Sequence, residues 1–147
     1  MNSIKVNNLK MGIKSEYEIH SHLENYFGKL NNTDERFGKH FEFDFFNESV
    51  YVELKTRNVK HNQFPTLIFG ENKLFKGDEL LKANPNLRIF YLFRCIDGIY
   101  YWEHRSTNHT KGMIKRIDRG KVELSMCVHI KTYDLKKLDT ILIKSSL

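Results

Sequence analysis

The chain has 147 residues, of which 40% are hydrophobic and 13% aromatic. This length predicts one domain over residues 1–147, and this composition excludes a disordered chain. No apolar run is long enough to cross a bilayer, and residues 1–10 lack a signal-peptide core. We therefore expect no membrane partner and a soluble intracellular protein, in the cytoplasm or nucleus, or in a host cell if the source is viral. The net charge of +6 suggests a polyanionic partner.

The first predicted element is a helix at about Gly12–Phe27, because Ile19, Leu23 and Phe27 recur with helical spacing and Gly28 supplies a stop. The further predicted elements are, in order, strands at about 40–46, 50–57 and 66–69, a helix at 72–83, a hairpin with strands 87–95 and 99–103 around an Asp97-Gly98 turn, a basic loop at 105–121, a strand at 122–132 and a short helix begun by Asp134. This order predicts an α/β (α+β) fold in which helices flank a mixed central sheet. Cys95 and Cys127 stand far apart in apolar surroundings, which predicts buried free thiols.

Positive charge is concentrated between Arg105 and Lys121, where six Lys or Arg residues stand against one acid. The side chains that we expect to contact nucleic-acid phosphates are Arg105, Lys111, Lys115, Arg116 and Arg119. A solvated loop with no ligand remains the alternative.

The strands over residues 41–46 and 50–55 carry the most informative pattern. Side chains alternate between the two faces of a sheet, which predicts one apolar face holding Phe43, Phe45, Val52 and Leu54. A two-residue loop at Glu48-Ser49 then places Asp44 opposite Glu53 on the other face, which also holds Lys55. Opposed carboxylates repel by roughly 0.2–1 kcal/mol, and a divalent cation with oxygen ligands removes that cost.

Lys55 follows Glu53 by two residues and therefore lies on the same face, where it can steer a water or neutralise a phosphate. Three acid-x-Lys triplets occur in the chain: Glu53-Leu54-Lys55, Glu71-Asn72-Lys73 and Asp134-Leu135-Lys136. Only the first lies inside a predicted strand beside another acid. The second follows a predicted turn at Gly70, and Asp134 resembles a helix cap.

The first helix adds a third acid. Glu16 lies within about 60° of the apolar stripe around the helix axis, where an unpaired carboxylate is otherwise unfavourable. Glu18 falls on the opposite face and fits a capping box with Ser15. We therefore take Glu16 as the candidate.

Together, Glu16, Asp44 and Glu53-Leu54-Lys55 resemble the PD-(D/E)XK nuclease superfamily, and the resemblance covers roughly residues 12–103. It implies a restriction-endonuclease-like α-β-β-β-α-β core. It also implies that Asp44 and Glu53 bind Mg²⁺ or Mn²⁺, that Glu16 is an accessory ligand, and that Lys55 is the motif lysine. The proline that often precedes the first acid is replaced by Phe43.

The resemblance also draws attention to two further basic residues. Members often place a polar or basic residue on the second helix near the site, which here is Lys73; a surface or capping role remains open. Arg57 shares the face of Lys55 and is a candidate phosphate contact.

These features predict a metal-dependent nuclease that hydrolyses phosphodiester bonds, with DNA favoured over RNA as substrate. Holliday-junction-resolvase-like, restriction-like and homing-type endonucleases fit equally well. One site per chain favours a homodimer for cutting both strands. The alternatives are a catalytically inactive nucleic-acid-binding or assembly module of the same fold, and an RNA endonuclease.

Overall fold

The computed structural model of the chain describes residues 16–32, 43–104, 109–118 and 120–141, of which 16, 17 and 116–118 are described by their main chain only. The elements in chain order are α2 (Glu16–Phe27), β1 (Asn31–Asn32), β2 (Phe45–Phe46), β3 (Val50–Thr56), β4 (Thr66–Gly70), α4 (Glu71–Ala83), β5 (Arg88–Cys95), β6 (Gly98–Glu103), β7 (Thr110–Asp118), β8 (Lys121–Lys131) and β9 (Lys136–Lys137), with short 3-10 helices at Thr132–Asp134 and Leu138–Thr140.

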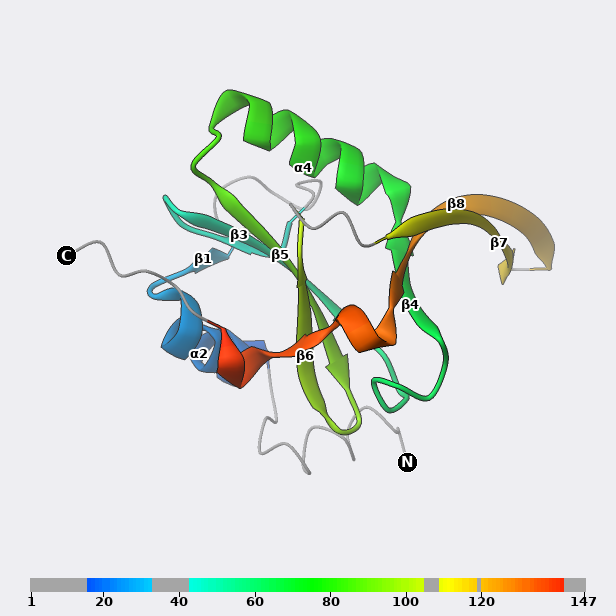
Figure 1. Ribbon diagram of the computed structural model, residues 1–147, viewed down its shortest axis with the longest axis horizontal. Helices are drawn as coiled ribbons and strands as arrows, with labels where there is room; N and C mark the ends of the chain where they lie inside the picture. The colour runs from blue at the N-terminus through cyan, green and yellow to red at the C-terminus, as the bar shows by residue number, and fades with distance from the viewer. Residues whose placement is uncertain (1–15, 33–42, 105–108, 119, 142–147) are drawn as a thin grey trace.

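The described strands form two sheets (Figure 1). The larger sheet has the order β1-β2-β3-β5-β6-β9, and β3 runs parallel to β5 while the other neighbours are antiparallel. The predicted mixed central sheet is therefore confirmed. The third predicted strand, β4, is a correction: it pairs with β8 in a smaller antiparallel sheet of order β4-β8-β7.

Two core clusters cover the two faces of the larger sheet. On one face, Leu23 of α2 packs with Val52 of β3 and Leu92 of β5. On the other face, Phe69 of β4 packs with Tyr91 and with residues of α4, β5, β6 and β8. Alternate residues of β4 are buried, so one face of that strand contributes to the core.

The first helix ends as predicted. Gly28 has a φ of +77° and donates its amide to the Glu24 carbonyl at 3.1 Å. The expected beginning at Gly12 lies outside the described residues. Both cysteines are buried free thiols, as predicted. Neither described helix is long and apolar enough to span a membrane.

Two predicted elements differ from the structure. The expected basic loop is instead strand β7, which pairs with β8 through a tight turn where Gly120 has a φ of +77°. Pairing satisfies the main-chain hydrogen-bonding groups that a loop would leave to water. The expected C-terminal helix is replaced by the two 3-10 helices and β9, and the Thr132 amide donates to the Pro65 carbonyl at 3.0 Å.

The hairpin turn between β5 and β6 is shifted by one residue from the predicted Asp97-Gly98. Cys95 pairs with Gly98, so the turn consists of Ile96 and Asp97. The Asp97 carboxylate accepts hydrogen bonds from the His61 amide at 2.9 Å and from its ring at 2.6 Å. This contact spans 36 residues and is not visible in the local sequence.

Candidate active site

The β2–β3 hairpin has the predicted register. Phe45 pairs with Val52, and the loop lies at Glu48-Ser49. The Asn47 side-chain oxygen accepts the amides of Ser49 and Val50 at 2.8 and 2.9 Å, so one side chain closes the turn. This loop places the start of β2 beside the middle of β3.

Asp44 differs from the prediction in how it approaches β3. Its amide donates to the Val52 carbonyl at 3.0 Å, although the ladder pairs Val52 with Phe45, so two residues face one as in a β-bulge. The Asp44 carboxylate accepts the Leu54 amide at 2.8 Å. The bulge reverses the alternation before it, so Phe43 joins the core cluster on the α4 side and not the face of Phe45.

Glu53 lies on the face of the sheet that α4 covers, because its parallel partner Tyr91 belongs to the core cluster there. The Glu53 side chain is only 3% exposed. Its Oε2 atom lies 2.6 Å from the Nζ of Lys73, which extends from the first turn of α4. The Glu53 carboxyl group is thus buried, and its polar neighbours are the Lys73 ammonium and the Asp44 carboxyl group.

The electrostatics of Glu53 are strongly perturbed. Burial, followed by a hydrogen bond and charge repulsion from Asp44, raises the pKa of the Glu53 carboxyl to about 8. The Lys73 ammonium acts in the opposite direction and lowers this pKa. The site therefore holds two interacting carboxyl groups and one cation, with Glu53 buried and Asp44 half-buried.

A buried polar network holds α4 in the position from which Lys73 reaches Glu53. The Tyr91 hydroxyl donates to the Lys73 carbonyl at 3.1 Å and lies 2.9 Å from His104 Nδ1. The other His104 nitrogen lies 2.8 Å from the Asp78 carboxylate. At Gly77 a Cβ would lie 2.6 Å from the His104 ring, so glycine permits this close packing.

Sequence reasoning missed Tyr91, His104 and Gly77 as supporting residues. Only the glycine inside a predicted helix was a visible signal, since the other two act through contacts between elements far apart in the chain.

Comparison with protein families gives a match over residues 13–138 to the family described as "Phage putative PDDEXK endonuclease". The chain belongs to this family. The match includes all the candidate acids and both candidate lysines of the site. Searches of curated proteins and of solved structures found no match.

Lys55, which the sequence predicts to be the motif lysine, is half-buried on β3. Its parallel partner Phe93 belongs to the same core cluster as Tyr91, so Lys55 lies on the Glu53 side of the sheet. Glu16 is the first residue of α2, and its side chain lies outside the described residues. Its proposed role as a ligand therefore stays a prediction.

A PDDEXK site uses carboxylate oxygens for a divalent cation, and the chemistry of Asp44 and Glu53 fits this requirement. Among the described side chains, no group of three or more His, Cys, Asp or Glu residues is placed to hold a metal. Two carboxylates suit Mg²⁺, which commonly retains several waters and is held by one or two protein carboxylates.

Of the predicted phosphate-binding residues discussed next, Arg57 and Lys111 contact other groups of the protein, and the remaining ones are exposed or lie outside the description. The Arg57 guanidinium donates to the Ile68 carbonyl at 2.8 Å, which ties β3 to β4. Lys111 lies 3.1 Å from Glu71 at the start of α4. Lys115 is exposed on β7, Arg116 lies on β7 with its side chain outside the description, and Arg105 and Arg119 lie outside the described residues.

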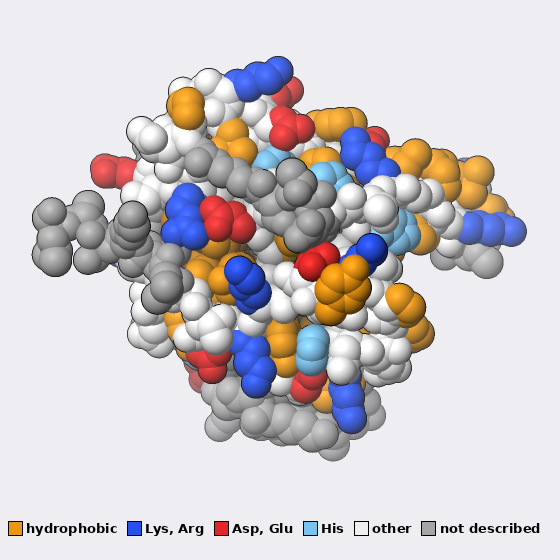
Figure 2. Space-filling view, viewed as in Figure 1, with side chains coloured by type: hydrophobic (Ala, Val, Ile, Leu, Met, Phe, Trp, Pro, Cys, Tyr) orange, Lys and Arg blue, Asp and Glu red, His pale blue; other side chains and the backbone are white. Residues whose placement is uncertain are grey.

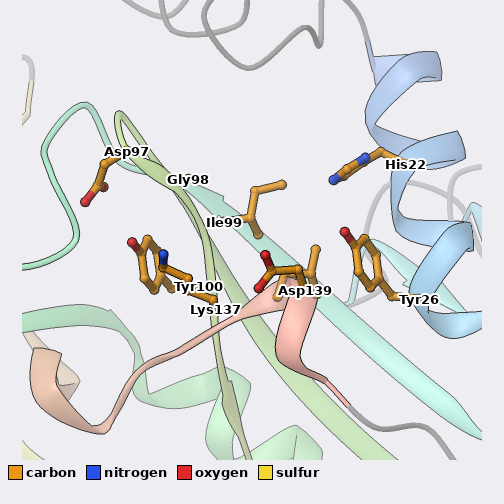
Figure 3. A pocket seen from close by; sticks show the side chains of 9 residues that line it. His22, Tyr26, Asp97, Gly98, Ile99, Tyr100, Lys137 and Asp139 are labelled. Carbon is orange, nitrogen blue, oxygen red and sulfur yellow. The ribbon is translucent and has the colours of Figure 1, made fainter.

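A separate pocket of about 290 Å³ lies between α2 and the edge formed by β6 and β9 (Figure 3). His22 and Tyr26 extend toward it from α2, while Tyr100 and Asp139 line it from the other elements. None of the candidate catalytic residues with a described side chain lines this pocket. We therefore place the candidate active site at Asp44, Glu53 and Lys73.

Proposed function

We propose that this member of the PDDEXK family is a metal-dependent endonuclease that hydrolyses phosphodiester bonds, with DNA favoured over RNA. The observation that supports this most is the buried contact between the carboxyl groups of Asp44 and Glu53. Folding brings these two acids together, and burial, followed by the contact with Asp44, raises the pKa of the Glu53 carboxyl to about 8. A divalent cation bound by both carboxylates would offset this cost.

In this proposal, Asp44 and Glu53 bind Mg²⁺ or Mn²⁺ through their carboxylate oxygens, with Glu16 as a further ligand. The cation supplies an activated water and shields the phosphate charge. Lys55 lies on the Glu53 side of the sheet and positions the attacking water or neutralises charge in the transition state. Family membership supports the use of a divalent metal in general.

Basic side chains around the site would bind the substrate backbone. Lys73 is the nearest, with its ammonium already in the site. Arg57 and the basic residues of the 105–121 segment are proposed phosphate contacts at greater distance. A homodimer is proposed for cleavage of both strands of a duplex, because each chain contributes one such site.

One observation favours a second candidate, a non-catalytic nucleic-acid-binding or assembly module. The Lys73 ammonium already compensates Glu53 at 2.6 Å, so the buried acid has a partner without metal. Isothermal titration calorimetry separates the two functions. Measurable Mg²⁺ or Mn²⁺ binding that Glu53→Gln abolishes supports the nuclease, and no binding in either protein supports the inactive module.

The direct test is cleavage of duplex, single-stranded and branched DNA and of RNA by purified protein with Mg²⁺ or Mn²⁺. We expect DNA cleavage that Glu53→Gln and Asp44→Asn abolish, and we expect Lys55→Ala to lose turnover while retaining metal binding. Asp134→Asn is the matched control, because it alters another acid-x-Lys triplet outside the site. Full activity of Glu53→Gln would overturn the assignment, and cleavage of RNA alone would establish the RNA endonuclease.

A further inference from the structure

The β7–β8 hairpin extends from the body of the protein as a two-stranded arm (Figure 1). Strand β4 pairs with β8 only from Cys127 to Lys131, so among the described residues the stretch 121–126 pairs with β7 alone. A two-stranded ribbon with no further support is marginally stable in water. An arm of this kind is therefore expected to be stabilised by a partner.

One face of the arm carries a row of exposed apolar side chains. Met113 pairs with Met126, and these side chains are 52% and 39% exposed. Leu124 and Val122 follow on the same face of β8, because they alternate with Met126, and they are 67% and 58% exposed. Hydrophobic side chains along the projecting arm are visible at the right of Figure 2. Contiguous exposure of this kind marks an interaction surface.

The same face also carries positive charge. Lys115 is the cross-strand partner of Leu124, and Lys111 is the partner of Val128, so both lysines share the side of the apolar row. Counted over both faces, the hairpin sequence from residue 110 to residue 126 contains five Lys or Arg residues and two acids. Packing the positively charged hairpins of two copies against each other is electrostatically unfavourable. A polyanionic partner fits both features.

The root of the arm is joined to the candidate active site. The Lys111 ammonium lies 3.1 Å from the Glu71 carboxylate and 4.9 Å from the centre of the Phe75 ring. Glu71 begins α4, and Lys73, which contacts Glu53, lies two residues later on the same helical turn. A ligand held along the arm would therefore reach toward the site through the beginning of α4.

We propose that the β7–β8 arm binds duplex DNA, with its apolar row inserted at base steps in a groove and its lysines on the flanking phosphates. Apolar side chains such as Leu and Met act as wedges in this way and bend the duplex, while basic side chains hold the backbone. The inference rests on the proposed function to the extent that DNA is the substrate. Beyond the proposed function, the inference names the element that binds the DNA and the bend that this element causes in the duplex.

The test measures binding without cleavage, using the full chain in EDTA with a short duplex that carries a fluorophore at each end. We expect energy transfer to rise on binding, because bending brings the ends together. The double variant Leu124→Ser/Met126→Ser should bind about tenfold more weakly and lose the change in energy transfer. Lys115→Ala should instead lower the slope of log affinity against log salt concentration by about 1. Phe64→Ser is the matched control, since Phe64 is 53% exposed outside the arm.

Binding and bending equal to the wild type in the double variant would overturn the proposal. It would also be overturned if sedimentation showed that the wild type is a dimer and the double variant a monomer, because the row would then be an interface between copies. A preference for single strands or for duplex RNA would exclude duplex DNA as the partner. The binding assay contains EDTA and does not depend on cleavage. An absence of cleavage in the separate activity assay would refute the nuclease, and the binding results would still test the arm.

Discussion

The raised pKa of Glu53 predicts how the stability of the metal-free protein changes with pH. Glu53 has a pKa of about 8 in the folded chain and an ordinary value of 4.5. Between these values the folded state binds more protons than the unfolded state, so stability falls as pH rises from about 4.5 to about 8. Replacing Glu53 with Gln, a neutral side chain of similar shape, should remove this dependence.

The magnitude follows from the size of the pKa difference. Each pH unit between the two pKa values changes the free energy of unfolding by about 1.36 kcal/mol, so from pH 5 to pH 8 the wild type should lose on the order of 4 kcal/mol relative to Glu53→Gln. The Glu53 side chain is only 3% exposed, so solvent screening reduces this effect little. The favourable pairing with Lys73 is already contained in the pKa of about 8.

The assay is urea unfolding in EDTA at pH 5, 6, 7 and 8, followed by circular dichroism. The quantity of interest is the difference between the wild type and Glu53→Gln, because titrating groups that do not interact with Glu53 cancel in it. Glu79→Gln is the matched control, as its side chain is 70% exposed on α4. A difference that stays constant over this pH range would refute the reasoning and show that Glu53 is ionised throughout.

Three further predictions concern the site and its support. Mn²⁺ affinity measured by calorimetry should rise about tenfold per pH unit below pH 8, because binding requires loss of the Glu53 proton; a flat profile would contradict this. In metal-free protein Asp44→Ala should cost about 1–3 kcal/mol, since the Leu54 amide loses its acceptor, while Asp44→Asn retains an oxygen and should cost less in urea unfolding. Gly77→Ala should destabilise the fold by about 1–3 kcal/mol in thermal unfolding, because its Cβ would lie 2.6 Å from His104. This cost should exceed the gain in helix propensity of about 1 kcal/mol. An unchanged or higher melting temperature would show that His104 moves freely.

The parts of the fold that were predictable depend on local chemistry. The register of the β2–β3 hairpin follows from a two-residue loop and the alternation of apolar side chains, and both are visible in the sequence. The bulge at Asp44 was not predictable, because it depends on a main-chain hydrogen bond to Val52. The assignment of β4 to a second sheet depends on pairing with β8, about 60 residues later in the chain, and no local pattern encodes that choice.

The candidate site shows the same division. Asp44 and Glu53 could be paired from strand alternation, but the burial of Glu53 could not, because α4 covers it from elsewhere in the chain. The triplet Glu71-Asn72-Lys73 was set aside as a turn, although its lysine is the residue that contacts Glu53. The acid-x-Lys pattern thus pointed to residues of the site. It did not show how they meet, because they are brought together by tertiary contacts.

Lys73 is held at two points of different kinds, which bears on how the site would change on binding a cation. Its main-chain carbonyl accepts the buried Tyr91 hydroxyl at 3.1 Å, while its Nζ atom lies 2.6 Å from Glu53. The helix is therefore fixed, but the four-carbon side chain retains rotatable bonds. Under the proposed function the ammonium can leave Glu53 without moving α4, because only side-chain rotation is required. An ammonium released in this way remains on the first turn of α4, where it would neutralise a substrate phosphate next to a cation held by Asp44 and Glu53. The same lysine would then stabilise the buried acid before the substrate arrives and the substrate afterwards.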